Sequence, residues 1–151
     1  MEVSRDFGAL VGRVMLALIF VLSGYQKLMD PAAVMKGMGA HGLPILPVAF
    51  VVTIAIEFGC ASLLIVGYKA RWAALLIFLW FIPVTLIYHV HDYYKAVAQQ
   101  QAAGALIQRI MVLKNLSIMG GLLMVASFGP GGISADGRGR DVGAADTRRA
   151  A

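Results

Sequence analysis

Glu57 is the only charged residue among the 32 residues between Lys36 and Lys69. The stretch around it is long and apolar enough to cross a membrane, which takes about 20 predominantly apolar residues. A carboxylate at that depth costs at least about 2.5–3.5 kcal/mol on insertion scales unless another group pairs with it. We therefore expect a membrane protein in which a cation from another segment meets this carboxylate.

Four segments have the length and composition of membrane-spanning helices. Hydrophobic residues make up 60% of the chain and charged residues only 14%, which excludes an ordinary water-soluble core. The predicted spans are residues 7–28, 47–66, 72–89 and 106–128. The predicted fold is all-α, a polytopic four-helix membrane bundle over residues 1–130. Residues 131–151 are mostly Gly, Ala, Arg and Asp, with Ile133 and Val142 as the only larger apolar residues, and are predicted to form a disordered cytoplasmic tail.

Basic residues near the helix ends predict that both termini are cytoplasmic, because cytoplasmic loops carry an excess of Lys and Arg. With four spans, the termini share one side with the loop between spans two and three. That side holds Arg5, Lys69, Arg71, Arg138, Arg140, Arg148 and Arg149. The other side holds only Lys27, Lys36, Lys95 and Arg109. Loops of about residues 29–46 and 90–105 then face outward, and the net charge of +5 favours anionic lipid over nucleic acid as a partner.

Helical spacing directs the intramembrane charges toward the bundle interior. Arg13 and Lys27 share a stripe with Gly24, and small residues mark the packed faces of membrane helices. At about 1.5 Å per residue, Glu57 lies about 15 Å and Lys114 about 12 Å below the outer helix ends. We therefore predict a Glu57–Lys114 pair, either a structural ion pair or a ligand or proton site. Arg13 is deeper and could extend toward Glu57, whereas Lys27 near the rim could simply extend to the interface.

Short motifs in a fixed order resemble the DoxX family of small four-helix membrane proteins. They span about residues 8–135 and read GR at 12–13, FVLSGYQKL at 20–28, Glu57, GYKAR at 67–71, TLIYH at 85–89, LKNLSIMGGLL at 113–123 and FGPG at 128–131. His89 and Asn115 lie within these motifs and are additional site candidates. The resemblance implies a multi-pass protein of the bacterial inner membrane. It also implies a redox association, because some members are membrane subunits of a quinone-reducing, sulfur-oxidising enzyme.

Motifs for self-contained catalysis are absent from the sequence. There is no Walker loop, dinucleotide-binding glycine fingerprint, HExxH or Gly-x-Ser-x-Gly. A single cysteine, Cys60, cannot form an internal disulfide, so redox chemistry would need a bound cofactor or a partner. No metal site is predicted, since His89 and His91 diverge on a helix and no carboxylate or thiolate set completes a site.

Two function classes remain open. The first is a membrane subunit of an oxidoreductase that holds a quinone or similar apolar ligand, anchored by Lys114, Glu57 and Arg13. It would work in the lipid bilayer with a soluble or membrane redox partner. The second is a non-catalytic scaffold, monomeric or oligomeric, in which the same charges only fix helix packing. A small transporter or proton path is a third and weaker interpretation.

Overall fold

The computed structural model describes residues 2–138, and every regular element in that range is helical. Four helical stretches are long and apolar enough to cross a membrane: Val3–Met29, Leu46–Val66, Ala70–Ala98 and Ala102–Phe128. These stretches contain the four predicted spans. The all-α, four-span prediction is therefore confirmed.

Two of the spans contain a π-helical turn in the middle. The first span is α1 (Glu2–Met29) and the fourth is α7 (Ala102–Phe128). The second consists of α3 (Leu46–Ile54), η1 (Ala55–Cys60) and α4 (Ala61–Val66), and the third of α5 (Ala70–Val84), η2 (Thr85–Val90) and α6 (His91–Ala98). Pro83 precedes η2 and has no N–H to donate to the carbonyl four residues earlier, which weakens the α-helical pattern there. Such π turns often occur at functional sites.

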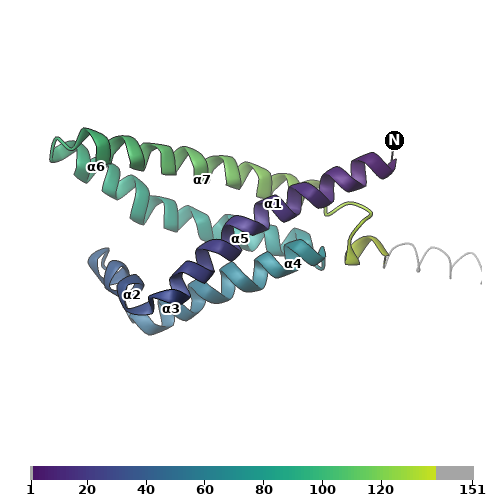
Figure 1. Cartoon of the computed structure of the whole chain (residues 1–151), viewed down its shortest axis with the longest axis horizontal. Helices are drawn as coiled ribbons and strands as arrows, with labels where there is room; N and C mark the ends of the chain where they lie inside the picture. The colour runs from purple at the N-terminus through teal and green to yellow at the C-terminus, as the bar shows by residue number, and fades with distance from the viewer. Residues whose placement is uncertain (1, 139–151) are drawn as a thin grey trace, which may run out of the picture.

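The two ends of the molecule differ in construction (Figure 1). The N-terminus, the turn after α4 and residues 131–138 lie at one end, and α2 (Pro31–Ala40) and the α6–α7 turn lie at the other. Both described ends of the chain are thus on the same side of the bundle, as four spans require. Which side faces the cytoplasm stays a prediction.

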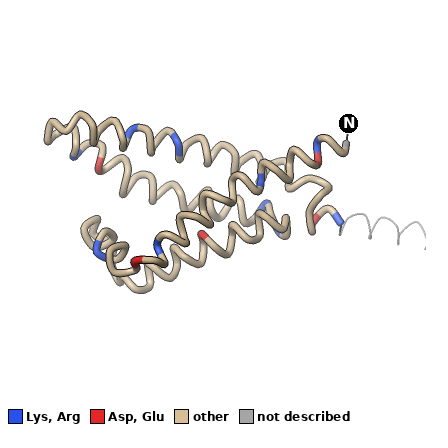
Figure 2. The backbone as a smooth tube through the Cα atoms, in the orientation of Figure 1, with Lys and Arg blue, Asp and Glu red and all other residues tan. Residues whose placement is uncertain are grey.

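Small side chains allow the helices to pack closely in the core. Ala17, Ala61, Ala74 and Leu122 are fully buried, and Phe20 meets Phe81 edge to face with ring centroids 5.1 Å apart. The outer surface instead carries many large exposed apolar side chains, including Met15, Leu18, Trp72, Leu116 and Met124. Figure 2 shows few charged residues along the spans. This distribution suits a surface in contact with lipid tails.

The first and third loops contain more helix than hydropathy indicates. The first loop holds α2, a helix of 10 residues. The third, expected over residues 90–105, is instead helical through α6, so that only residues 99–101 connect α6 to α7. The side chains of α6 are polar enough to end the hydropathy signal, yet nothing in them breaks a helix.

The predicted tail, 131–151, falls mostly outside the described residues. Its first part, residues 131–138, is described and packs against the end of the bundle. The N–H of Gly132 donates to Asp6 Oδ1 (2.7 Å), and the Asp136 carboxylate accepts from the N–H groups of Lys69 (2.9 Å) and Ala70 (3.1 Å). The carboxylate therefore caps the first turn of α5.

Candidate ligand-binding cavity

Glu57 forms an ion pair with Lys27. The Lys27 Nζ lies 2.8 Å from Oε1 and 3.0 Å from Oε2 of Glu57, and it also donates to the Ser23 hydroxyl. The side chain of Glu57 is 8% exposed and that of Lys27 is 25% exposed. The prediction that a cation from another helix meets Glu57 is confirmed, but the predicted partner, Lys114, is wrong. Lys27 does not extend to the interface.

Gly24 explains why α1 approaches η1 closely enough for this pair. A Cβ at Gly24 would lie 2.7 Å from Phe58 Cε2 and 3.4 Å from Glu57 Oε2. A larger residue would therefore force the Phe58 ring or the two helices to shift. The π turn also affects the pair. Glu57 lies within η1, so the direction of its side chain departs from regular α-helical spacing.

Lys114 is exposed near the middle of α7. Its Nζ lies 3.3 Å from the Met111 sulfur, a weak acceptor, and no described carboxylate forms a salt bridge with it. An ammonium at this depth is costly without a partner. The side chain is therefore available to a ligand or to another protein.

Arg13 lies at the opposite end of the bundle and does not extend toward Glu57. It is 1% exposed, and its guanidinium donates to the carbonyls of Leu64 (2.9 Å) and Ile133 (2.7 Å). The first is a C-terminal carbonyl of α4, which lacks an intrahelical partner. Arg13 thus fastens residues 131–138 and the end of α4 to α1.

A cavity of about 550 Å³ opens between the four spans and α2. Five of the six candidate residues line it: Lys27, Glu57, His89, Lys114 and Asn115. Val34 and Met38 of α2 lie on one wall, and Trp80 and Tyr88 also line the cavity; the sequence did not single out these four as lining residues. Both aromatic residues lie in the third span, where hydropathy does not distinguish lining residues from lipid-facing ones.

Hydrogen bonds hold the other two polar candidates in place. Asn115 is 2% exposed, and its Nδ2 donates to Thr85 Oγ1 over 3.0 Å. His89 Nδ1 lies 2.9 Å from Gln108 Oε1, so η2 is joined to α7 at two points. Since Thr85 and His89 belong to η2, both π turns present polar side chains near the cavity.

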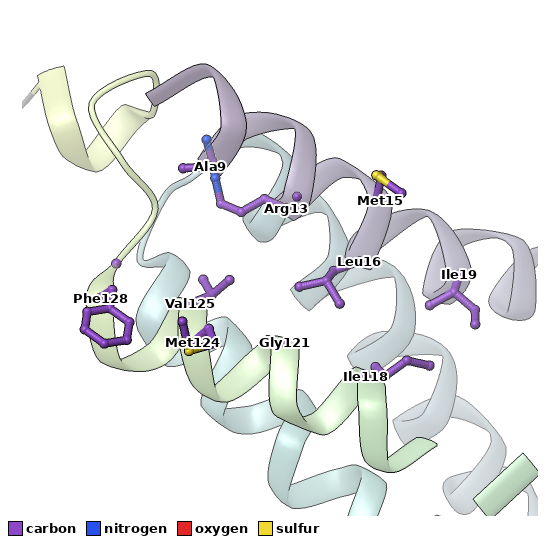
Figure 3. Close-up of a pocket in the computed structure, with 12 residues that line it drawn as sticks. Ala9, Arg13, Met15, Leu16, Ile19, Ile118, Gly121, Met124, Val125 and Phe128 are labelled. Carbon is purple, nitrogen blue, oxygen red and sulfur yellow. The ribbon is translucent and has the colours of Figure 1, made fainter. Parts of the chain in front are cut away.

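A second groove, of about 700 Å³, lies between α1 and α7. Figure 3 shows Leu16 from α1 and Val125 from α7 pointing into the space between these helices. Arg13 contributes to its lining but donates to the backbone carbonyls described above. The groove is otherwise apolar and resembles lipid-facing surface more than a site for a polar head group.

The DoxX family model matches residues 8–90, more than half of the chain. This protein belongs to the DoxX family. It is 31% identical to the Escherichia coli K12 "Inner membrane protein YphA" and 30% identical to "Inner membrane protein YqjF" from the same strain. These matches cover 88% and 90% of this chain and 95% of each relative. No solved structure matches it significantly.

The relatives and the four apolar spans together identify this DoxX protein as a multi-pass inner-membrane protein. Its motifs gather into two clusters. Gly12-Arg13, residues 67–71 and residues 128–131 come together at the end that Arg13 fastens, where Gly67 has a φ of 73° and ends α4. Ser23, Lys27 and Glu57 form the other cluster at the cavity.

Proposed function

We propose that this DoxX-family protein binds a quinone, or a ligand with a similar polar head and apolar tail, as a membrane subunit of a redox system. The observation that supports this proposal best is Lys114, an exposed ammonium in the middle of a span, beside a cavity that also contains Lys27, Glu57, His89 and Asn115. The volume of the cavity lies within the usual range for ligand pockets, about 300–1,000 Å³.

Lys114 is the group best suited to donate to a quinone oxygen. The Lys27 ammonium already donates to Glu57 and Ser23, so much of its capacity is used. An ammonium stabilises the negative charge that develops on a quinone oxygen as it is reduced. The two electrons for reduction to quinol would come from a redox partner and the two protons from water, while this chain holds and polarises the head group.

The apolar part of the cavity suits the ring and the first part of a tail. Trp80 and Phe81 supply aromatic surface from the third span, and Val34 and Met38 supply aliphatic surface from α2. Aromatic rings pack favourably in offset or edge-on arrangements, which a planar quinone can join. A tail would leave between the spans into lipid.

The scaffold alternative is favoured by one observation, the completeness of the Lys27–Glu57–Ser23 contacts. A satisfied ion pair between α1 and η1 can fix helix register without any ligand. That interpretation gives no role to Lys114 in binding a small molecule.

The test is quinone content in protein purified in mild detergent from bacterial membranes. Lys114→Met should lower quinone affinity by about 10–100-fold, since a hydrogen bond to a charged group contributes about 1.5–3 kcal/mol. Lys95→Met, an exposed lysine of α6 outside the cavity lining, is the control and should retain quinone. The quinone proposal is contradicted if the wild-type protein carries no quinone, or if a folded Lys114→Met variant binds quinone with normal affinity. Either result would favour the scaffold interpretation.

A further inference from the structure

Three side chains that could ligate a metal meet at the α2 and α6 end of the molecule. His41 Nε2 lies 3.1 Å from Asp92 Oδ1, and His91 Nδ1 lies 3.3 Å from the same oxygen. One ligand atom from each of the three residues lies within 4.8 Å of the others. His41 follows α2, and the other two residues begin α6. His41 and Asp92 are 51 positions apart along the chain.

Each ring nitrogen of His41 faces an oxygen that can accept a hydrogen bond. Its Nδ1 lies 2.9 Å from the Gly37 carbonyl oxygen, and its Nε2 faces the Asp92 carboxylate. Both neighbours are acceptors, but a neutral imidazole carries only one N–H. If Nδ1 donates to the carbonyl, Nε2 presents a lone pair beside the Asp92 carboxylate, and a metal ion can accept electron pairs from both. Metal-ligating histidines typically donate their other N–H to a backbone carbonyl or a carboxylate, as His41 can here.

We propose that His41 Nε2, His91 Nδ1 and Asp92 Oδ1 bind a divalent transition metal of the zinc class. Two imidazoles and one carboxylate suit Zn²⁺ and leave a fourth position for water, whereas Mg²⁺ and Ca²⁺ prefer all-oxygen ligands. At bond lengths of about 2.0–2.1 Å, tetrahedral ligand atoms lie about 3.3 Å apart. Both distances to Asp92 fit this value. The His91 side chain is 61% exposed and can rotate to bring its nitrogen toward His41.

This site changes the expectation drawn from the sequence. His89 and His91 do not form a site together, because His89 is bound to Gln108 at the cavity. The missing ligand is His41, whose position in a loop gives it no periodic relation to the third span. Only the approach of His41, just after α2, to the start of α6 brings the three residues together.

A metal here would hold α2 in place beside the cavity. The His41 ring lies against Tyr88, with centroids 4.3 Å apart, and Tyr88 lines the cavity, as do Val34 and Met38 of α2. Metal binding would therefore tie the segment that covers one wall of the cavity to the start of α6. The metal site stands independently of the ligand proposed for the cavity.

The experiment is zinc titration of the full chain, purified without a polyhistidine tag and stripped with chelator. Calorimetry should give one Zn²⁺ per chain that excess Mg²⁺ does not displace, and Co²⁺ should give the visible spectrum of a tetrahedral site. His41→Gln and Asp92→Asn should each weaken Zn²⁺ binding by more than the ~10–100-fold typical of outer-shell changes.

His89→Gln is the matched control, since it removes a neighbouring histidine that lies outside the cluster, and it should bind Zn²⁺ as the wild type does. His91→Gln changes an exposed ligand of the same site. It replaces His41→Gln as the test if the His41 variant does not fold, and it should also weaken Zn²⁺ binding. Absence of saturable 1:1 binding in the wild type would overturn the metal site and leave only the polar contact between His41 and Asp92. Equal losses in His89→Gln and in the cluster variants would overturn it as well.

Discussion

Lys27 Nζ lies 2.8 Å from Glu57 Oε1 and joins the last turn of α1 to the π turn of the second span. The Lys27 and Glu57 side chains both lie at the cavity wall rather than in lipid. Each charge lowers the cost of burying the other, so loss of one partner should cost more than loss of both.

Glu57→Gln should therefore destabilise the protein, because it leaves the Lys27 ammonium without its carboxylate. We expect a loss at the lower end of ~3–5 kcal/mol, since the Lys27 side chain is 25% exposed. The double variant Lys27→Met, Glu57→Gln should recover much of that loss. Thermal unfolding in detergent checks both. Glu57→Gln combined with Lys114→Met should recover little of the lost stability. If this double variant instead recovers more stability than Lys27→Met, Glu57→Gln, Lys114 is the partner of Glu57.

Gly24→Ala should destabilise the protein, although alanine ordinarily favours helix more than glycine does. The new Cβ would lie 2.7 Å from Phe58 Cε2, so the Phe58 ring or the two helices must shift, at a cost of about 1–3 kcal/mol. Gly12→Ala is the matched control on the same helix, because no atom lies within 4 Å of the added Cβ. Unfolding midpoints should fall for Gly24→Ala and hold or rise for Gly12→Ala.

The spans were predictable from the sequence because the bilayer fixes how long an apolar helix must be. The site was predictable only in part. Counting residues gave Glu57 and Lys114 similar depths, but depth does not determine which way a side chain points. The π turns η1 and η2 alter the rotation per residue, so regular helical spacing fails at Glu57 and His89.

Arg13 shows a second limit of sequence reasoning. Its place on the packed face of α1 was predictable, but its acceptors are backbone carbonyls of Leu64 and Ile133. Every residue has a carbonyl, so no side-chain pattern marks these two as partners. The cluster of His41 with Asp92 was equally hidden, since one of its residues lies in a loop.

Arg13→Met should loosen the end of the bundle that carries residues 131–138. It removes charged donors from two carbonyls, and hydrogen bonds to charged groups contribute about 1.5–3 kcal/mol. Hydrogen exchange should rise at residues 132–136, and the unfolding temperature should fall. Arg5→Met, an exposed arginine of the same helix, is the control and should change neither. Unchanged exchange in a folded Arg13→Met protein would show that these contacts do not hold the segment.

The orientation of the bundle is the remaining prediction, and it depends on seven basic residues against four. Both Gln99, between α6 and α7, and Tyr68, between α4 and α5, are exposed and lie at opposite ends of the bundle. In a Cys60→Ala background, Gln99→Cys should react with a membrane-impermeant maleimide in intact cells. Tyr68→Cys should react only after the membrane is opened, because it lies on the predicted cytoplasmic side. The reverse pattern would invert the orientation, and it would place α2 and the His41–Asp92 cluster on the cytoplasmic side.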